Sequence, residues 1–186
     1  MPPPFETPAG LLARLAALGI EAETVEHPPL FTVAESKALR GGLPGLHAKS
    51  LFLEPRAGPR VLAVLEEDRR VSINALGRLL GVGRLGFATP GTLLAELGVA
   101  PGSVTPFALV NAAPGTVRVV LDRVLAEAAA GVRLNFHPLV NTATTAIRPG
   151  DLLRFLRHLG HEPAVIDPPA PAPAGEGKGA DRGGAA

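Results

Sequence analysis

The stretch His47-Ala48-Lys49-Ser50-Leu51-Phe52-Leu53 decides how the fold is read. A charged residue opens an apolar run that has the length and composition of a buried β-strand. A second apolar run follows over residues 60–65, and the connection between the two contains Pro55, Gly58 and Pro59. Two strands joined by such a turn predict a β-hairpin.

The lysine in this stretch is uncommon in its own sequence. The chain has three lysines, Lys37, Lys49 and Lys178, against fifteen arginines. Lysine is a compact point charge with rotatable donors, whereas arginine is a planar fork, so the two are not equivalent at a site. Spacing alone leaves two interpretations of Lys49 open: a solvated residue at a strand end, or a functional cation held by a strand.

Strand and helix signals alternate outward from this hairpin without a fixed period. Strands are predicted over residues 21–26, 48–54, 60–65, 84–88, 107–111, 116–121, 132–136, 141–147 and 164–166, and the fifth and sixth are predicted to pair as a hairpin. Helices are predicted over residues 7–18, 32–40, 73–80, 90–97, 122–130 and 149–159. This order argues against a doubly wound parallel sheet, which needs regular alternation. We therefore expect an α/β (α+β) fold with a mixed, barrel-like curled sheet surrounded by helices.

Length and composition limit the organisation of the chain. Its 186 residues, 46% of them hydrophobic, suit one domain, which we expect over residues 1–167. Residues 168–186 are rich in Pro, Ala and Gly and are expected to form a disordered tail. The start of the chain lacks a signal peptide and no apolar run reaches membrane-spanning length, so a cytoplasmic monomer without a membrane partner is the default expectation.

The same composition excludes several classes of site. A net charge of +1 provides no global basic field, so any contact with nucleic acid must be local. The absence of cysteine excludes disulfides, thiolate metal sites and cysteine nucleophiles. His158 and His161 do not form a zinc-protease motif, and Lys49-Ser50 lacks the glycines of a phosphate-binding loop. We therefore expect no metal and no cofactor.

Three features remain as candidates for chemistry. They are Lys49, the loop Gly102-Ser103-Val104-Thr105-Pro106, and His137, which stands before a threonine-rich run. The Gly and Pro of the loop can hold backbone amides in a fixed and exposed arrangement. Each feature taken singly is also explained by structure alone: a strand end, a turn, and a packing histidine before proline.

Four ordered motifs resemble the YbaK/ProX family, and within it the stand-alone prolyl-tRNA editing deacylases of the ProX/PrdX type. The resemblance extends over roughly residues 7–167, and its motifs are residues 31–35, 47–53, 102–107 and 136–145. It implies a mixed, barrel-like sheet surrounded by helices. It also implies hydrolysis of the ester that joins a wrong amino acid to the tRNA 3′ end, in particular alanine on tRNA(Pro). The implied partners are the tRNA acceptor end and prolyl-tRNA synthetase.

The resemblance also assigns residues. The family's strand lysine, loop glycine and pocket histidine fall on Lys49, Gly102 and His137, which are the implied catalytic residues. The implied substrate-binding residues are Phe31, Ser50, Ser103, Val104, Thr105, Pro106 and Asn141. We expect the ammonium of Lys49 to contact the 3′-terminal nucleotide, because a phosphate gains a charge-assisted hydrogen bond from it. His137 is expected in the wall of a small amino-acid pocket. Many relatives have asparagine where this chain has Ser50, which loses the reach of the amide.

Two other classes of function stay open at this point. One is a module that binds aminoacyl-tRNA or a synthetase without catalysis. The other is an esterase for small amino-acid esters unrelated to tRNA, which the low net charge would tolerate. The lack of a strong acid–base pair in the sequence is compatible with editing, because an activated ester needs positioning and carbonyl polarisation more than a strong protein base.

Overall fold

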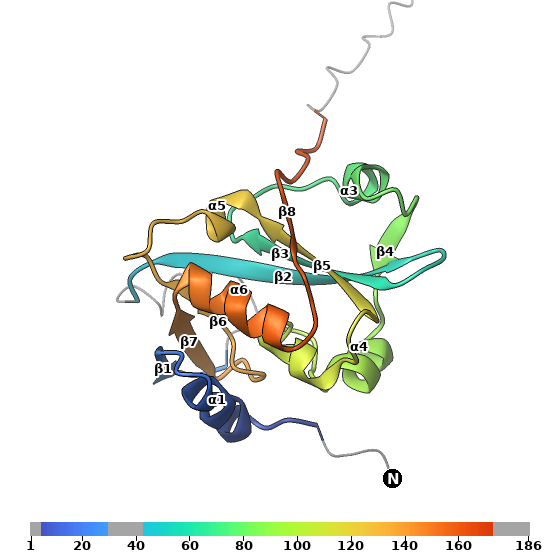
Figure 1. Ribbon diagram of the computed structural model, residues 1–186. Coiled ribbons are helices and arrows are strands. Elements are labelled where there is room, and N and C mark those ends of the chain that lie inside the picture. Colours follow the sequence, from blue (N-terminus) through green and yellow to red (C-terminus); the bar gives the residue numbers. More distant parts are fainter. Residues whose placement is uncertain (1–4, 30–42, 173–186) are drawn as a thin grey trace, which may run out of the picture.

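The computed structural model describes residues 5–29 and 43–172. Within these residues, eight strands form one mixed sheet in the order β1-β7-β6-β2-β3-β5-β8, and β4 pairs with β2 beside this path (Figure 1). The strands are β1 (Ala22–Glu26), β2 (Leu46–Pro55), β3 (Arg60–Glu66), β4 (Leu85–Phe87), β5 (Val117–Asp122), β6 (Leu134–Phe136), β7 (Ala143–Ile147) and β8 (Ala164–Ile166).

The helices begin where the sequence predicts caps. Thr7, Ser72 and Thr89 each accept a hydrogen bond from a backbone N–H in the first turn of the helix that follows, which satisfies a donor left without an intrahelical partner. The helices are α1 (Pro8–Ala17), α3 (Ile73–Leu79), α4 (Pro90–Leu97), the 3₁₀ helix η1 (Pro106–Asn111), α5 (Arg123–Ala126) and α6 (Pro149–His158). The helix expected over residues 32–40 lies outside the described residues.

Strand β2 connects the two parts of the sheet. It pairs antiparallel with β3 from Ala48 to Leu53, so the hairpin predicted from the opening stretch is confirmed. At its start it also pairs with β6 in parallel, and at its end it pairs antiparallel with β4. A strand with neighbours on both sides is fixed in register and direction, which makes β2 a rigid support for the side chains it carries.

The two faces of the sheet are covered differently. On one face, which we call the α6 face, a large buried cluster includes Phe52, Leu134 and Phe136 together with residues of α1, α4, η1 and α6. On the other, the α3 face, a smaller cluster joins Leu53 and Leu65 to α3. Figure 1 shows α6 and α3 on opposite sides of β2. Neighbouring residues of β2 therefore enter different environments.

The predicted fold class is confirmed, with one qualification about closure. The sheet is mixed, curled and flanked by helices, but β1 and β8 remain at its two edges, so it does not close into a barrel. Parallel pairs β2–β6, β3–β5 and β5–β8 occur beside antiparallel pairs. This mixture matches the irregular order of strands and helices in the sequence.

The predicted hairpin over residues 107–111 and 116–121 is wrong. The first segment is η1, which Pro106 opens and where Thr105 Oγ1 accepts a hydrogen bond from the backbone N–H of Phe107 at 3.3 Å. The second segment, β5, instead pairs in parallel with β3 and β8. Apolar character alone favours a strand over residues 107–111, whereas proline at a first helical position and its threonine cap favour a helical turn.

One further prediction about the end of an element needs correction. The helix expected over residues 122–130 is limited to α5, because residues 127–130 bury little surface and alanine propensity alone does not sustain a short helix. The chain also stays packed beyond the predicted domain boundary, since Pro168 is buried and Pro169 O accepts from Ser72 N at 2.8 Å. Residues 173–186 of the expected tail lie outside the described residues.

Candidate functional site

Lys49 and Ser50 are neighbours in sequence but lie on opposite faces of the sheet. Successive side chains of a strand point to opposite faces. Because Phe52 belongs to the α6-face cluster and Leu53 to the α3-face cluster, Ser50 lies on the α6 face and Lys49 on the α3 face. The two predicted site residues therefore cannot act on one group from the same side.

His137 lies on the same face as Lys49. Leu134 and Phe136 of β6 pack into the α6-face cluster, so the alternation carried one residue beyond β6 places His137 on the α3 face. Strands β2 and β6 run in parallel with Leu46 opposite Leu134. The lysine and the histidine thus project from neighbouring strands at the same end of one face.

One hydrogen bond of His137 indicates which ring nitrogen carries the proton in the neutral tautomer. Its Nδ1 lies 3.0 Å from the carbonyl oxygen of Ala143, which can only accept, so Nδ1 carries the proton and donates. The second nitrogen, Nε2, is then an acceptor in the neutral ring. The ring of His27 lies beside it, with centroids 6.1 Å apart. His27 Nε2 is 2.9 Å from Thr144 Oγ1, and His27 Nδ1 donates to Pro28 O at 2.9 Å.

His27 and Thr144 were not among the residues expected at the site. Thr144 is buried, and it belongs to the threonine-rich run that the sequence marks without distinguishing its members. A signal for His27 is present in the sequence as a His-Pro pair at a strand end, which repeats the pair formed by His137 and Pro138. What the sequence does not show is that the two pairs meet.

The ammonium of Lys49 is held by backbone carbonyls. Nζ donates to Glu67 O at 2.9 Å and also to Arg69 O, in the segment that follows β3. Burial lowers the pKa of Lys49 below its ordinary value, and nearby carboxylates, led by Glu66, oppose this without cancelling it. Two of the three donors of the ammonium are therefore used by the protein, and the direction of the third is constrained.

Gly102 lies against the segment that follows His137. Its φ of +87° is a left-handed conformation that favours glycine, and a Cβ added there would lie 3.8 Å from Asn141 Nδ2. The loop therefore lies beside the segment of residues 137–142, with Asn141 next to Gly102. Two motifs that are far apart in the sequence are neighbours in the fold.

The rest of the loop is fixed by packing. Ser103 and Thr105 are buried, and Val104 packs against the α6-face cluster. Ser103 N donates to Ala100 O at 3.0 Å, and Pro106 opens η1. The loop is therefore a rigid part of the fold. Phe31, the remaining predicted site residue, lies outside the described residues.

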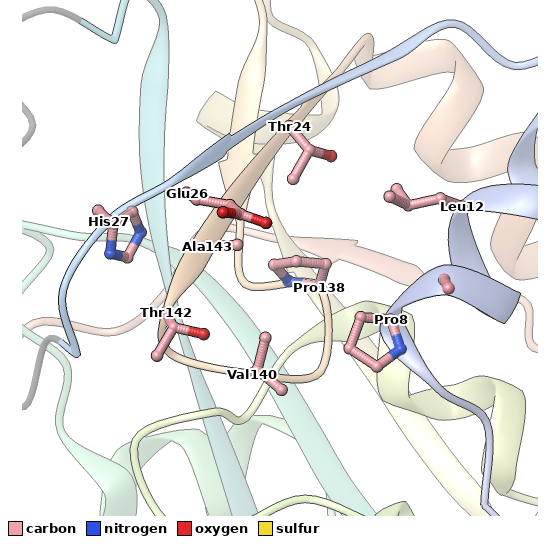
Figure 2. Close-up of a pocket in the computed structure, with 10 residues that line it drawn as sticks. Pro8, Leu12, Thr24, Glu26, His27, Pro138, Val140, Thr142 and Ala143 are labelled. Carbon is pink, nitrogen blue, oxygen red and sulfur yellow. The ribbon is translucent and has the colours of Figure 1, made fainter.

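A separate hollow lies between α1, β1 and the segment after His137. Its volume is about 790 Å³, and it is lined by Pro8, Ala9, Leu12, Thr24, Glu26, His27, Pro138, Val140, Thr142 and Ala143. Figure 2 shows Glu26, Thr24 and Pro138 between the strands and α1. We call this the α1 hollow. None of the residues predicted for catalysis or substrate binding lines it, but it adjoins His137. Ala143, whose carbonyl oxygen accepts from His137 Nδ1, and His27, whose ring lies beside that of His137, are both in its lining.

Two absences bear on the kind of site. Within residues 5–29 and 43–172, no group of three or more His, Asp or Glu side chains could hold a metal ion. Across the same part of the chain, every helix is too short or too polar to cross a lipid bilayer.

Comparison with known families and proteins gives a consistent result. The model of the aminoacyl-tRNA editing domain matches residues 27–155. The prolyl-tRNA synthetase associated domain-containing protein 1 of Bos taurus is 40% identical over 166 residues, which span 87% of this chain and 95% of that protein.

More distant relatives extend the comparison. The prolyl-tRNA editing protein ProX of Acetoanaerobium sticklandii is 28% identical over 158 residues, 84% of this chain and 94% of that protein. A solved structure of a candidate trans-editing enzyme for prolyl-tRNA synthetase shares the fold, with a TM-score of 0.64 and 22% identity over 90% of this chain and 99% of that one. The chain therefore belongs to the aminoacyl-tRNA editing domain family, in its YbaK/ProX-type branch.

Proposed function

We propose that this protein is a trans-editing hydrolase that removes alanine from mischarged tRNA(Pro). The observation that carries the proposal is the family match over residues 27–155, which includes Lys49, the Gly102–Pro106 loop and His137. The relative named as a prolyl-tRNA editing protein supports the prolyl system. The position of Lys49 and His137 on one face of neighbouring strands supports a common site.

Hydrolysis of the aminoacyl ester depends more on positioning of the ester than on strong acid–base catalysis. Water attacks the carbonyl carbon of the aminoacyl ester, the carbonyl oxygen becomes an oxyanion, and the bond to the ribose oxygen then breaks. The ribose oxygen takes a proton, and the products are free alanine and tRNA with a free 3′ end. Donors aimed at the oxyanion lower the barrier of this step.

Lys49 supplies a donor whose direction is restricted. Two of its N–H groups donate to the carbonyls of Glu67 and Arg69, and we assign the third to a substrate oxygen. Two targets remain, a phosphate of the 3′-terminal nucleotide or the developing oxyanion. The first affects KM and the second affects kcat, so the kinetics of a Lys49 variant separates them.

His137 and Gly102 shape the rest of the site. The hydrogen bond from His137 Nδ1–H to Ala143 O fixes the orientation of the ring, which we assign to the side of the site where the α-amino group of the substrate binds. The ring also forms a wall that admits alanine and excludes a larger side chain. Gly102 has a left-handed backbone and no side chain, which would let the substrate ester approach the backbone amides of this loop.

The α1 hollow does not suit the alanine side chain. It lies beside α1, which covers the α6 face, and its volume of about 790 Å³ is in the range for a whole small ligand and not for a methyl group. A pocket that discriminates by size must fit the smaller ligand closely. We therefore assign the amino-acid pocket to the α3 face, beside His137.

A local basic surface lies on the same side of the sheet as Lys49. Among the described residues, Arg70, Arg78 and Arg84 are exposed and have no carboxylate partner. They flank or belong to α3, which covers the α3 face. Arginine forms charge-assisted contacts with phosphate, so this surface suits the acceptor stem in a chain whose net charge is +1.

A second function is favoured by the names of the vertebrate relatives. The Bos taurus relative is named as a protein that contains a prolyl-tRNA synthetase associated domain. This protein would then bind the synthetase, either to receive mischarged tRNA from it or as a module without catalysis. Receiving mischarged tRNA from the synthetase is compatible with editing, whereas binding without catalysis is not.

A deacylation assay separates these functions. Purified protein is incubated with Ala-tRNA(Pro), Pro-tRNA(Pro) and an alanine ester, with and without prolyl-tRNA synthetase. We expect rapid loss of alanine from Ala-tRNA(Pro), little loss of proline, and little hydrolysis of the simple ester. Binding of Ala-tRNA(Pro) without hydrolysis would contradict the hydrolase. Equal hydrolysis of the ester would indicate a general esterase.

A further inference from the structure

A buried carboxylate fixes the segment that holds Lys49. Asp122 ends β5 and its side chain has no exposed surface. Its two oxygens accept from Arg69 Nε and Nη2, both at 3.0 Å, which makes a bidentate pair. Oδ2 also accepts from the backbone N–H of Glu66 at 3.2 Å. The carboxylate thus binds the end of β3 and the side chain of Arg69 together.

The same segment is tied to β2 through its backbone. Glu67 N donates to His47 O at 3.0 Å, and Arg69 N donates to Glu66 O at 3.1 Å. The carbonyls of Glu67 and Arg69 then accept from Lys49 Nζ. We refer to residues 66–69 as the lysine cradle. Its two carbonyls can hold the ammonium in one place because hydrogen bonds on both sides fix their own positions.

Arg69 has a second effect, which concerns charge. The ammonium of Lys49 lies close enough to Asp122 for an electrostatic attraction between them. The guanidinium of Arg69 occupies both oxygens of that carboxylate. Without Arg69, Asp122 would be a buried negative charge without its partner, and Lys49 would be the nearest cation to compensate it. Arg69 therefore keeps Lys49 on the cradle carbonyls.

We propose that Asp122 and Arg69 are positioning residues for Lys49. They do not touch the substrate. They fix the lysine cradle, which directs the remaining N–H of Lys49 toward the substrate oxygen. This inference rests on the proposed function in so far as it gives Lys49 a substrate contact, but the effect on Lys49 itself can be measured without substrate.

The test compares two bidentate arginine–carboxylate pairs. The double variant Arg69→Met/Asp122→Asn removes the pair without leaving a buried charge. Glu66 N–H and Val124 N–H bind different oxygens of Asp122, so the amide introduced at position 122 keeps an acceptor for one of these two backbone donors. The control is Arg157→Gln, which breaks the pair of Arg157 Nε and Nη2 with Glu162 on an exposed helix end. Circular dichroism confirms that each variant is folded. Arg69→Lys keeps the positive charge but cannot form the bidentate hydrogen bonds with Asp122. It is the variant to use if the double variant does not fold.

Mobility of the lysine ammonium is the first measurement. With three lysines in the chain, ¹⁵N relaxation of their side-chain ammonium groups at mildly acidic pH gives few signals, and Lys49→Arg identifies that of Lys49. We expect a rigid Lys49 in the native protein and in Arg157→Gln. In the double variant its order parameter is expected to fall below about 0.6, a value typical of mobile groups.

Deacylation of Ala-tRNA(Pro) is the second measurement. We expect kcat/KM to fall by about tenfold or more in the double variant, since small displacements of a positioned group are costly, and to stay unchanged in Arg157→Gln. An ammonium that stays rigid in the folded double variant, or an equal loss of rate in the control, overturns the proposal. If the native protein does not deacylate but Lys49 becomes mobile in the variant, positioning is supported and the proposed function fails.

Discussion

The two faces of the sheet differ sharply where β2, β6 and β7 meet. The α6 face buries Phe52, Leu134 and Phe136 under α1 and α6, and beside α1 lies a hollow that none of the predicted site residues lines. The α3 face at the same place carries Lys49 and His137. The difference separates a hollow shaped by apolar packing from the face that carries the polar residues predicted for the site.

The contrast has a physical basis. The α6 face gains stability from apolar contact, which is non-directional and tolerates substitutions of similar size. The α3 face holds polar groups through directed hydrogen bonds, such as those of Lys49 Nζ with backbone carbonyls. A change in the apolar cluster of the α6 face is expected to alter stability. A change of the polar residues on the α3 face, which lie outside its own apolar cluster, is expected to alter activity.

The largest expected effect is that of Lys49→Ala. Loss of a donor directed at the substrate is expected to lower kcat/KM for Ala-tRNA(Pro) by about 100-fold or more. The melting curve should change little, because Lys49 is not part of either hydrophobic cluster. Single-turnover deacylation measures the rate. Native activity in this variant would show that Lys49 is not part of the site. It would also contradict the assignment of activity to the α3 face.

His137→Ala is expected to have the second-largest effect on activity. Loss of one hydrogen bond and of the pocket wall should lower the rate with Ala-tRNA(Pro) by about tenfold, the factor that corresponds to about 1.4 kcal/mol. The enlarged pocket should also raise hydrolysis of Pro-tRNA(Pro). His27→Ala is the matched comparison, with an expected loss of about threefold because it acts through Thr144. An equal loss in both variants would contradict the role of His137 as a wall.

Ser50→Ala tests the residue that is next to Lys49 but on the other face. We expect kcat/KM to change by less than about threefold, since the hydroxyl points away from the polar face. Ser50→Asn, which introduces the amide that the family resemblance leads us to expect at this position, is the companion variant. A loss as large as that of Lys49→Ala would place substrate on the α6 side of β2.

Filling the α1 hollow is expected to have almost no effect on turnover. Ala9 is exposed on α1 and lines the hollow, so Ala9→Phe adds volume there without replacing a core side chain. We expect kcat/KM within about twofold of the native value, as for surface substitutions away from a site. A large rise in the KM for Ala-tRNA(Pro) in this variant would indicate that the hollow belongs to the substrate site.

The smallest effect concerns stability and pH. The folded pKa of Lys49 lies below its ordinary value of 10.5, so the folded protein binds fewer protons than the unfolded chain between the two values. Stability relative to Lys49→Met should therefore rise as pH increases from neutral toward 10.5. Urea denaturation of both proteins at several alkaline pH values measures the difference. A fall over this interval would mean that the carboxylates outweigh burial.

Much of the local structure could be predicted from sequence. The helix starts at Thr7, Ser72 and Thr89 were predicted because a cap depends on residues within one turn. The hairpin of β2 and β3 was predicted for the same reason, since its turn is short. The strand assigned to residues 107–111 was wrong because an apolar run is compatible with either state and Pro106 decided for the helical one.

The candidate site was predicted less completely. The motifs identified Lys49, Gly102 and His137, but they did not indicate that His27 and Thr144 lie beside His137. Nor did they indicate that Arg69 and Asp122 enclose the segment that binds Lys49. These contacts join residues that are distant in sequence, and the spacing of residues along one segment carries no information about them.

The sequence by itself determined the periodicity of β2, the helix caps and the family motifs, because each depends on neighbouring residues. The opposite orientation of Lys49 and Ser50 follows from the alternation of side chains along one strand. The tertiary structure alone decided that Lys49 and His137 share a face and that Asp122 reaches Arg69. The reason is register. A shift of one residue in either β2 or β6 would move every side chain of that strand to the opposite face of the sheet. The packing of the whole core fixes the register that prevents this.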